Sequence, residues 1–251
     1  MFKLATALIL GIATSAVAQD SDETIEPSRI TVKMMPGITS SAQLPTQELI
    51  DARKSLTQGR RIYTSQLRQI ADLGDGFAAL KFAEWLEDSE TAQQSDIAHY
   101  YGIAAATGRL NAFNRLLDAL DHIDPAELPR ARSNVLEGIV FAYARAGNSR
   151  AVDAVIRYQV TQKPFGRIDS EVESLLAQAH GDTASSISLH LALTILQNEA
   201  HSPDDLARAQ AYIQTAAESD SLETQLVAAN LTPLLDVALS KQAEIPTEVM
   251  Q

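Results

Sequence analysis

The fold is decided by residues 74–108, which read GDGFAALKFAEWLEDSETAQQSDIAHYYGIAAATG. The stretch begins and ends at a glycine, and its middle, 88–94, is polar and lacks a helical period. After Gly74, a small residue (Ala78) and a large apolar one (Phe82) lie four positions apart, which places both on one face of a helix. The stretch therefore predicts two antiparallel helices joined by a polar turn.

The same pattern recurs along the rest of the chain. Turn residues are spaced 34 to 39 positions apart: Gly74-Asp75, Gly108, Gly147-Asn148, Gly181-Asp182 and Asp220. A small residue lies four positions after each turn (Ala78, Ala112, Ala151, Ser185, Thr224) and an apolar one eight positions after it (Phe82, Leu116, Val155, Leu189, Ala228). Because one helical hairpin cannot bury both of its apolar faces, hairpins with this period are expected to stack. The predicted fold is all-α, a right-handed α-solenoid of four to five antiparallel helix pairs over residues 74–240.

These residues resemble Sel-one-like repeats, close relatives of tetratricopeptide repeats. The first helix of that family reads Gly-Asp-x-x-Ala-x-x-x-Leu-Ala-x-x-Tyr, and this chain has Gly74-Asp75-x-x-Ala78-x-x-x-Phe82-Ala83-x-x-Leu86. The second ends aromatic-aromatic-x-x-Ala-Ala-x-x-Gly, and this chain has Tyr100-Tyr101-x-x-Ala104-Ala105-x-x-Gly108. The resemblance covers residues 74–230, although the family's glycine-rich turn between the two helices is missing. It implies inner helices that line a concave surface.

The segments that flank the repeats have different compositions. Residues 1–18 combine Lys3, an apolar run and the small-x-small sequence Ala16-Val17-Ala18, which predicts a cleaved signal peptide. The alternative, a retained membrane anchor, is disfavoured because the apolar run is shorter than a bilayer requires. Residues 19–45 are polar and contain three prolines, which predicts a flexible leader. Residues 46–73 have helical spacing and 241–251 are expected to be a flexible tail.

Composition excludes several classes of protein. The formal net charge is −12 and the isoelectric point is about 4.8, which argues against a nucleic-acid partner. The chain has no cysteine, so disulfides and cysteine–zinc sites are excluded. After signal cleavage no further segment is apolar enough to span a membrane. These features predict a soluble exported protein, periplasmic or secreted, from a Gram-negative bacterium.

Motifs that would indicate catalysis are missing. The sequence contains no GxGxxG, no P-loop, no GxSxG elbow and no HExxH helix, and its five histidines lack metal-ligand spacing. We therefore expect no catalytic residue, no cofactor and no metal ion.

A candidate partner-binding groove follows from the resemblance. Positions two before and two after the large buried residue would face the concave surface, and further carboxylates lie one turn along. The candidate residues are Glu84, Glu87, Asp88, Asn114, Asp118 and Asp121. An acidic groove would bind a basic peptide through charge-assisted hydrogen bonds. The alternative is an ordinary solvated face of an acidic protein.

Three functions remain open at this point. The first is a non-catalytic scaffold that binds a protein partner in the cell envelope. The second is an envelope hydrolase or other enzyme, since some relatives of the family act in cell-wall chemistry, although those are cysteine-rich. The third is a chaperone-like protein that holds many clients.

Overall fold

A computed structural model of the chain describes residues 27–197 and 202–243. Every regular element in this part is helical, apart from one isolated β-bridge between Lys33 and Thr107. The all-α prediction is therefore confirmed for the described residues. The helices are α1 (Gln47–Thr57), α2 (Thr64–Asp72), α3 (Gly76–Glu87), α4 (Gln94–Ala106), α5 (Leu110–Asp121), α6 (Arg130–Arg145), α7 (Ser149–Thr161), α8 (Asp169–Gln178), α9 (Gly181–Leu196), α10 (Pro203–Ala217) and α11 (Leu222–Ala243), with short 3-10 helices η1 (Pro27–Arg29), η2 (Ser41–Gln43) and η3 (Pro125–Glu127).

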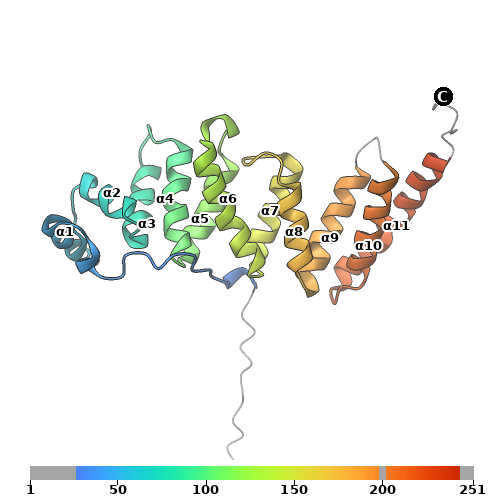
Figure 1. The fold of residues 1–251 in the computed structure, drawn as a ribbon, viewed down its shortest axis with the longest axis horizontal. Coiled ribbons are helices and arrows are strands. Elements are labelled where there is room, and N and C mark those ends of the chain that lie inside the picture. The colour runs from blue at the N-terminus through green and yellow to red at the C-terminus, as the bar shows by residue number, and fades with distance from the viewer. Residues whose placement is uncertain (1–26, 198–201, 244–251) are drawn as a thin grey trace, which may run out of the picture.

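The helices lie side by side in a long row, with successive helices running in alternating directions (Figure 1). Four of the five predicted turns fall between two helices, whereas Gly181-Asp182 already belongs to the first turn of α9, and the turn before it lies at Ala179-His180. Gly74, Gly108 and Gly147 have φ values of 90°, 91° and 85°. Only glycine adopts this left-handed conformation without a steric penalty. The glycines therefore end α2, α4 and α6, as the sequence predicted.

The residue after two of these glycines caps the next helix from a buried position. Asp75 is 2% exposed, and its Oδ1 accepts hydrogen bonds from the N–H groups of Phe77 and Ala78. Asn148 is fully buried, and its Oδ1 accepts from the N–H of Ala151. Such caps satisfy donors that the first turn of a helix leaves free.

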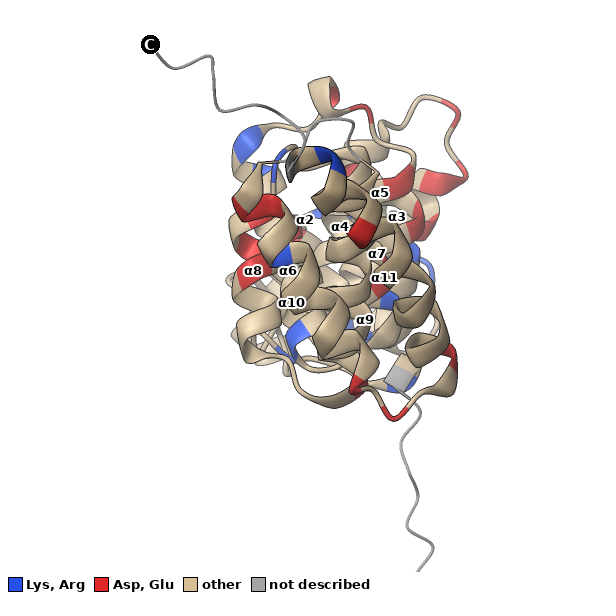
Figure 2. Ribbon diagram, turned by 90° about the vertical axis from the view of Figure 1, so that its right-hand side faces the viewer, with Lys and Arg blue, Asp and Glu red and all other residues tan. Residues whose placement is uncertain are grey.

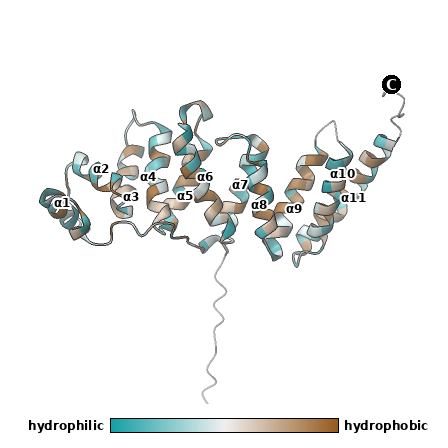
Figure 3. Cartoon of the chain, viewed as in Figure 1, coloured by the Kyte–Doolittle hydropathy of each residue, from teal (hydrophilic) through white to brown (hydrophobic). Residues whose placement is uncertain are grey.

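Small and large apolar residues fill the space between the helices. Ala78, Ala112 and Ala151 are fully buried, and hydrophobic residues recur along every helix of the row (Figure 3). Phe113 of α5 and Tyr143 of α6 stack with ring centroids 3.7 Å apart. The described core forms two clusters, a large one that reaches from Leu44 to α9 and a smaller one shared by α9, α10 and α11.

Residues 46–73, predicted to be an amphipathic helical region, form two helices, α1 and α2. The break lies at Gly59, whose φ is 74°. The N–H of Arg60 donates to the carbonyl of Ser55. This hydrogen bond is typical of a helix C-terminus that is followed by a glycine in the left-handed conformation. At the other end of the chain, α11 continues to Ala243, so 241–243 belong to a helix and not to the predicted tail.

The prediction of a flexible leader needs correction where the structure describes it. Residues 28–45, called the strap below, are held against the turns of three successive helix pairs (Figure 1). Asn148 Nδ2 donates to the carbonyl of Ile30 at 2.9 Å. The N–H of Met34 donates to the carbonyl of Ala106 at 2.8 Å, and the N–H of Ile38 to that of Gly74 at 3.2 Å.

The strap is bound because helix C-termini leave carbonyl groups without intrahelical donors. Its own N–H groups fill some of these acceptors, while Val32 and Ile38 pack against the core and Leu44 is buried. The strap passes the turn at Gly147 first and the turn at Gly74 last, so it runs opposite to the order of the repeats. The predicted signal peptide, 1–18, and the tail from 244 onward lie outside the described residues.

Candidate functional site

The acidic residues predicted to line a groove come from α3 and α5, and basic side chains neutralise part of that surface. Glu84 accepts a hydrogen bond from Lys81 Nζ at 2.7 Å within α3. Glu87 pairs with Arg115 of α5 at 3.3 Å. Because both pairs are largely exposed, each contributes at most about 1 kcal/mol to stability.

The remaining predicted groove residues are less uniform. Asp121 accepts hydrogen bonds from Nε and Nη2 of Arg157 on α7. The shorter of the two, from Nη2 to Oδ2, is 2.9 Å long. Asp88 and Asp118 are exposed, and Asn114 is half-buried with an Oδ1 atom that has no hydrogen-bond partner among the described residues. Acidic residues also lie on the opposite side of the row, near α6 and α8 (Figure 2).

Ion pairs connect alternate helices on this opposite side as well. Arg132 of α6 donates to Asp96 of α4 at 2.8 Å, and Arg208 of α10 pairs with Glu173 of α8 at 3.1 Å. In each case the carboxylate belongs to the earlier helix and the guanidinium to the later one. The pairs Glu87–Arg115 and Asp121–Arg157 follow the same order.

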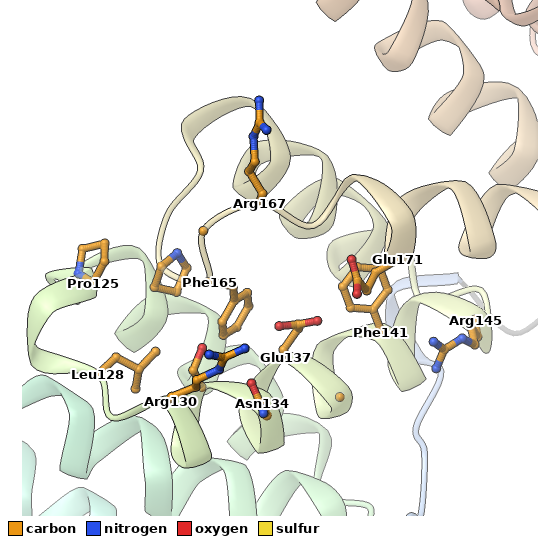
Figure 4. A pocket seen from close by; sticks show the side chains of 14 residues that line it. Pro125, Leu128, Arg130, Asn134, Glu137, Phe141, Arg145, Phe165, Arg167 and Glu171 are labelled. Carbon is orange, nitrogen blue, oxygen red and sulfur yellow. The ribbon is translucent and has the colours of Figure 1, made fainter.

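Among the described residues, no such ion pair connects α6 and α8, the two helices that lie between these pairs on the same side of the row. Glu137 of α6 and Glu171 of α8 face each other, and neither forms an ion pair with any residue that the structure describes. A pocket of about 650 Å³ opens here (Figure 4). It is lined by Pro125, Leu128, Arg130, Ser133, Asn134, Glu137, Gly138, Phe141, Arg145, Pro164, Phe165, Gly166, Arg167 and Glu171.

Glu137 lies in the middle of the pocket, with Arg130 on one side and Glu171 on the other (Figure 4). Burial raises the pKa of Glu137, and the negative charge of Glu171 raises it further. Arg130 and Arg167 make no hydrogen bond or ion pair in the described part of the chain. The pocket thus contains charged groups of both signs that the fold itself leaves unpaired.

Two aromatic rings complete the walls. Phe141 lies beneath the Arg145 guanidinium, whose central carbon is 5.8 Å from the ring centroid. Phe165 comes from the α7–α8 loop and meets Tyr158 edge to face at 5.5 Å. Phe141 is only 2% exposed, whereas Phe165 is half-buried and lines the same pocket as the two glutamates. Carboxylates and an aromatic ring are together suited to bind ammonium and guanidinium groups.

Comparison with protein-family models, with curated proteins and with solved structures gives no significant match. Among the described residues, no helix is both long and apolar enough to cross a membrane. The pocket must therefore be interpreted from its own chemistry.

This pocket was not predicted from the sequence, although the repeat period indicates that two of its residues lie close together. Residues about one period apart occupy equivalent positions on alternate helices, and 34 positions separate Glu137 from Glu171. A carboxylate that recurs at the repeat period predicts like charges that face each other. One wall of the pocket is formed by Phe165, which lies in the α7–α8 loop and for which the repeat pattern gives no signal.

Proposed function

We propose that the protein is an exported, non-catalytic scaffold of the cell envelope that binds a protein partner through the pocket between α6 and α8. The observation that carries this proposal is the junction itself, where two carboxylates replace the ion pair found at the neighbouring junctions. The proposed higher-order arrangement is a right-handed α-solenoid of four to five Sel-one-like helix pairs. Export rests on the three-part pattern of residues 1–18.

The charged residues of the pocket indicate which side chains a bound partner segment would contain. A lysine or arginine side chain of the partner would supply the cation that Glu137 and Glu171 lack, and it would pack against the half-buried Phe165. Acidic groups next to that residue in the partner would meet Arg130 or Arg167. The proposed ligand is therefore an extended segment in which basic and acidic residues alternate.

A direct test uses short peptides as probes and the mature chain, residues 19–251, labelled with ¹⁵N. The amides of Gly138 and Gly166 line the pocket and should report binding. We expect an acetylated, amidated Glu-Arg-Glu tripeptide to shift both signals, and the isosteric Glu-citrulline-Glu peptide to leave them unchanged. Equal shifts with both peptides would contradict recognition of a cation.

The same experiment separates the pocket from the predicted acidic groove. Glu137→Gln should abolish the shifts that the arginine peptide causes, whereas the double variant Glu84→Lys with Asp118→Lys should retain them. A photo-crosslinker at Asn134 in intact cells should then join a partner in a Glu137-dependent manner. If binding is lost in the groove variant and kept in Glu137→Gln, the groove is the site and the pocket is not.

Glu137→Gln should also make the free protein more stable at neutral pH. A glutamate whose pKa is raised by folding favours the fold when protonated, and this contribution is lost as the pH rises through the raised pKa. The amide has no charge to desolvate, so the thermal midpoint should increase at pH 7.5, and the increase should shrink as the pH falls through that pKa. Glu90→Gln, at an exposed site, is the control and should change little at either pH.

A further inference from the structure

Helix α11 has a second apolar face that no described residue covers. Its inner face, with Ala228, Leu231 and Leu235, is buried against α9 and α10. Successive residues of an α-helix are turned by about 100°, so a second set, Leu222, Leu226, Pro233 and Val237, falls within a stripe about 60° wide on the opposite side. The exposed fractions of Leu222, Leu226 and Val237 are 68%, 57% and 53%.

This stripe is unusual for the end of a stack of helices. The last helix of a repeat array normally carries a polar outer face, because nothing follows to cover it. Here residues 224–235 contain no charged residue, and Leu234, 57% exposed, extends the apolar surface on one flank. α11 is the last helix of the row, and no described helix lies beyond it (Figure 1).

The spacing of the stripe is symmetric. Leu222 and Val237 are equally far from the midpoint between Ala229 and Asn230, and so are Leu226 and Pro233. A two-fold axis through that midpoint would place each Leu222 against the partner's Val237. The small Ala229 at the centre permits the helices to approach closely.

The charges at the two ends favour the same arrangement. Glu223 and Lys241 lie on one flank of the stripe, near opposite ends of the helix. An antiparallel two-fold pairing keeps this flank on one side of the interface and brings each Glu223 to the region of the partner's Lys241, whereas a parallel pairing would place Glu223 and the partner's Lys241 on opposite flanks and at opposite ends, where they could not attract each other. From the symmetric stripe and these charges we infer that the protein forms a two-fold homodimer through antiparallel contact of two α11 helices.

This inference does not depend on the proposed pocket, because the two surfaces lie on different helices. In the dimer the two rows would extend away from a shared α11–α11 centre. Each dimer would then present two α6–α8 pockets, and a two-fold interface of this kind closes on itself rather than forming a filament.

Sedimentation velocity on the mature chain tests the inference. We expect a dimer that dissociates on dilution, and we expect Leu226→Asp to weaken it by about 100-fold, because the carboxylate would be buried without a partner. Val135→Asp replaces an equally exposed valine on α6 and should leave the dimer unchanged. Circular dichroism should show that both variants are folded, since both positions are exposed.

The absence of cysteine permits a geometric test as well. Ala229→Cys lies next to the proposed axis and should form an intermolecular disulfide on mild oxidation, whereas Lys241→Cys lies far from its own copy and should not. A chain that is monomeric at all concentrations overturns the inference. So does a dimer that Leu226→Asp leaves intact, or a full-length monomer that dimerises only when residues 244–251 are removed, because the tail would then be the occupant.

Discussion

Asp75→Ala should lower the free energy of unfolding by about 3–5 kcal/mol. The carboxylate caps α3 through two hydrogen bonds at 2.8 and 2.9 Å, and its other oxygen pairs with Arg53 Nε. The side chains of Asp75 and Arg53 are only 3% and 13% exposed. The substitution therefore leaves a nearly buried guanidinium without its counter-charge and removes the cap.

Urea denaturation monitored by fluorescence suits this measurement, because the single tryptophan, Trp85, lies in α3 and stacks on Phe82 at 5.5 Å. Asp75→Asn should retain the cap and lose only the ion pair, so its loss should be smaller by about 1 kcal/mol. Asp51→Ala removes an exposed aspartate that pairs with Lys54 and should cost less than about 0.5 kcal/mol. A similar loss for Asp75→Ala and Asp51→Ala would show that the buried pair does not stabilise the fold.

Phe113→Ala should also cost about 3–5 kcal/mol, for a different reason. Phe113 is fully buried, and its ring lies parallel to that of Tyr143 across the contact between α5 and α6. Removing the ring leaves a cavity between two helices whose backbones are held apart by large side chains. The same denaturation experiment measures the loss.

Two variants control for the loss of an aromatic ring and for the tyrosine hydroxyl. Phe77→Ala removes a half-buried phenylalanine whose ring faces Arg109 and Lys81, and it should cost far less than Phe113→Ala. Tyr143→Phe removes the hydrogen bond to the Ala105 carbonyl and should cost about 0.5–1.5 kcal/mol. If Phe113→Ala costs no more than Phe77→Ala, the stacked pair does not support the α5–α6 contact.

The helices and turns could be predicted because their determinants are local. Glycines at the repeat period need a left-handed conformation, and the small and large residues that follow each turn need one buried face. These constraints act within one helix and its turn, so Gly108, Ala112 and Leu116 could be placed from sequence alone.

The strap and the pocket could not be predicted in the same way, because they depend on contacts between distant residues. Ile30 is held by Asn148, 118 positions later, and a polar composition says nothing about that contact. Whether Glu137 meets an arginine or another glutamate depends on which residue α8 places opposite it. The predicted groove residues Glu87 and Asp121 were placed on helices correctly, but their arginine partners come from the next helix but one, α5 for Glu87 and α7 for Asp121.

The strap affects which helix pairs can separate from the array during partial unfolding. In a linear array each helix pair touches only its neighbours, so the ends can fray independently of the middle. Here a covalently continuous segment links the turn at Gly147 to the turn at Gly74, and the pairs between them cannot separate without breaking its hydrogen bonds. The first half of the array is thereby made one cooperative block, and partial unfolding is directed to α10 and α11, whose buried residues belong to the separate smaller cluster.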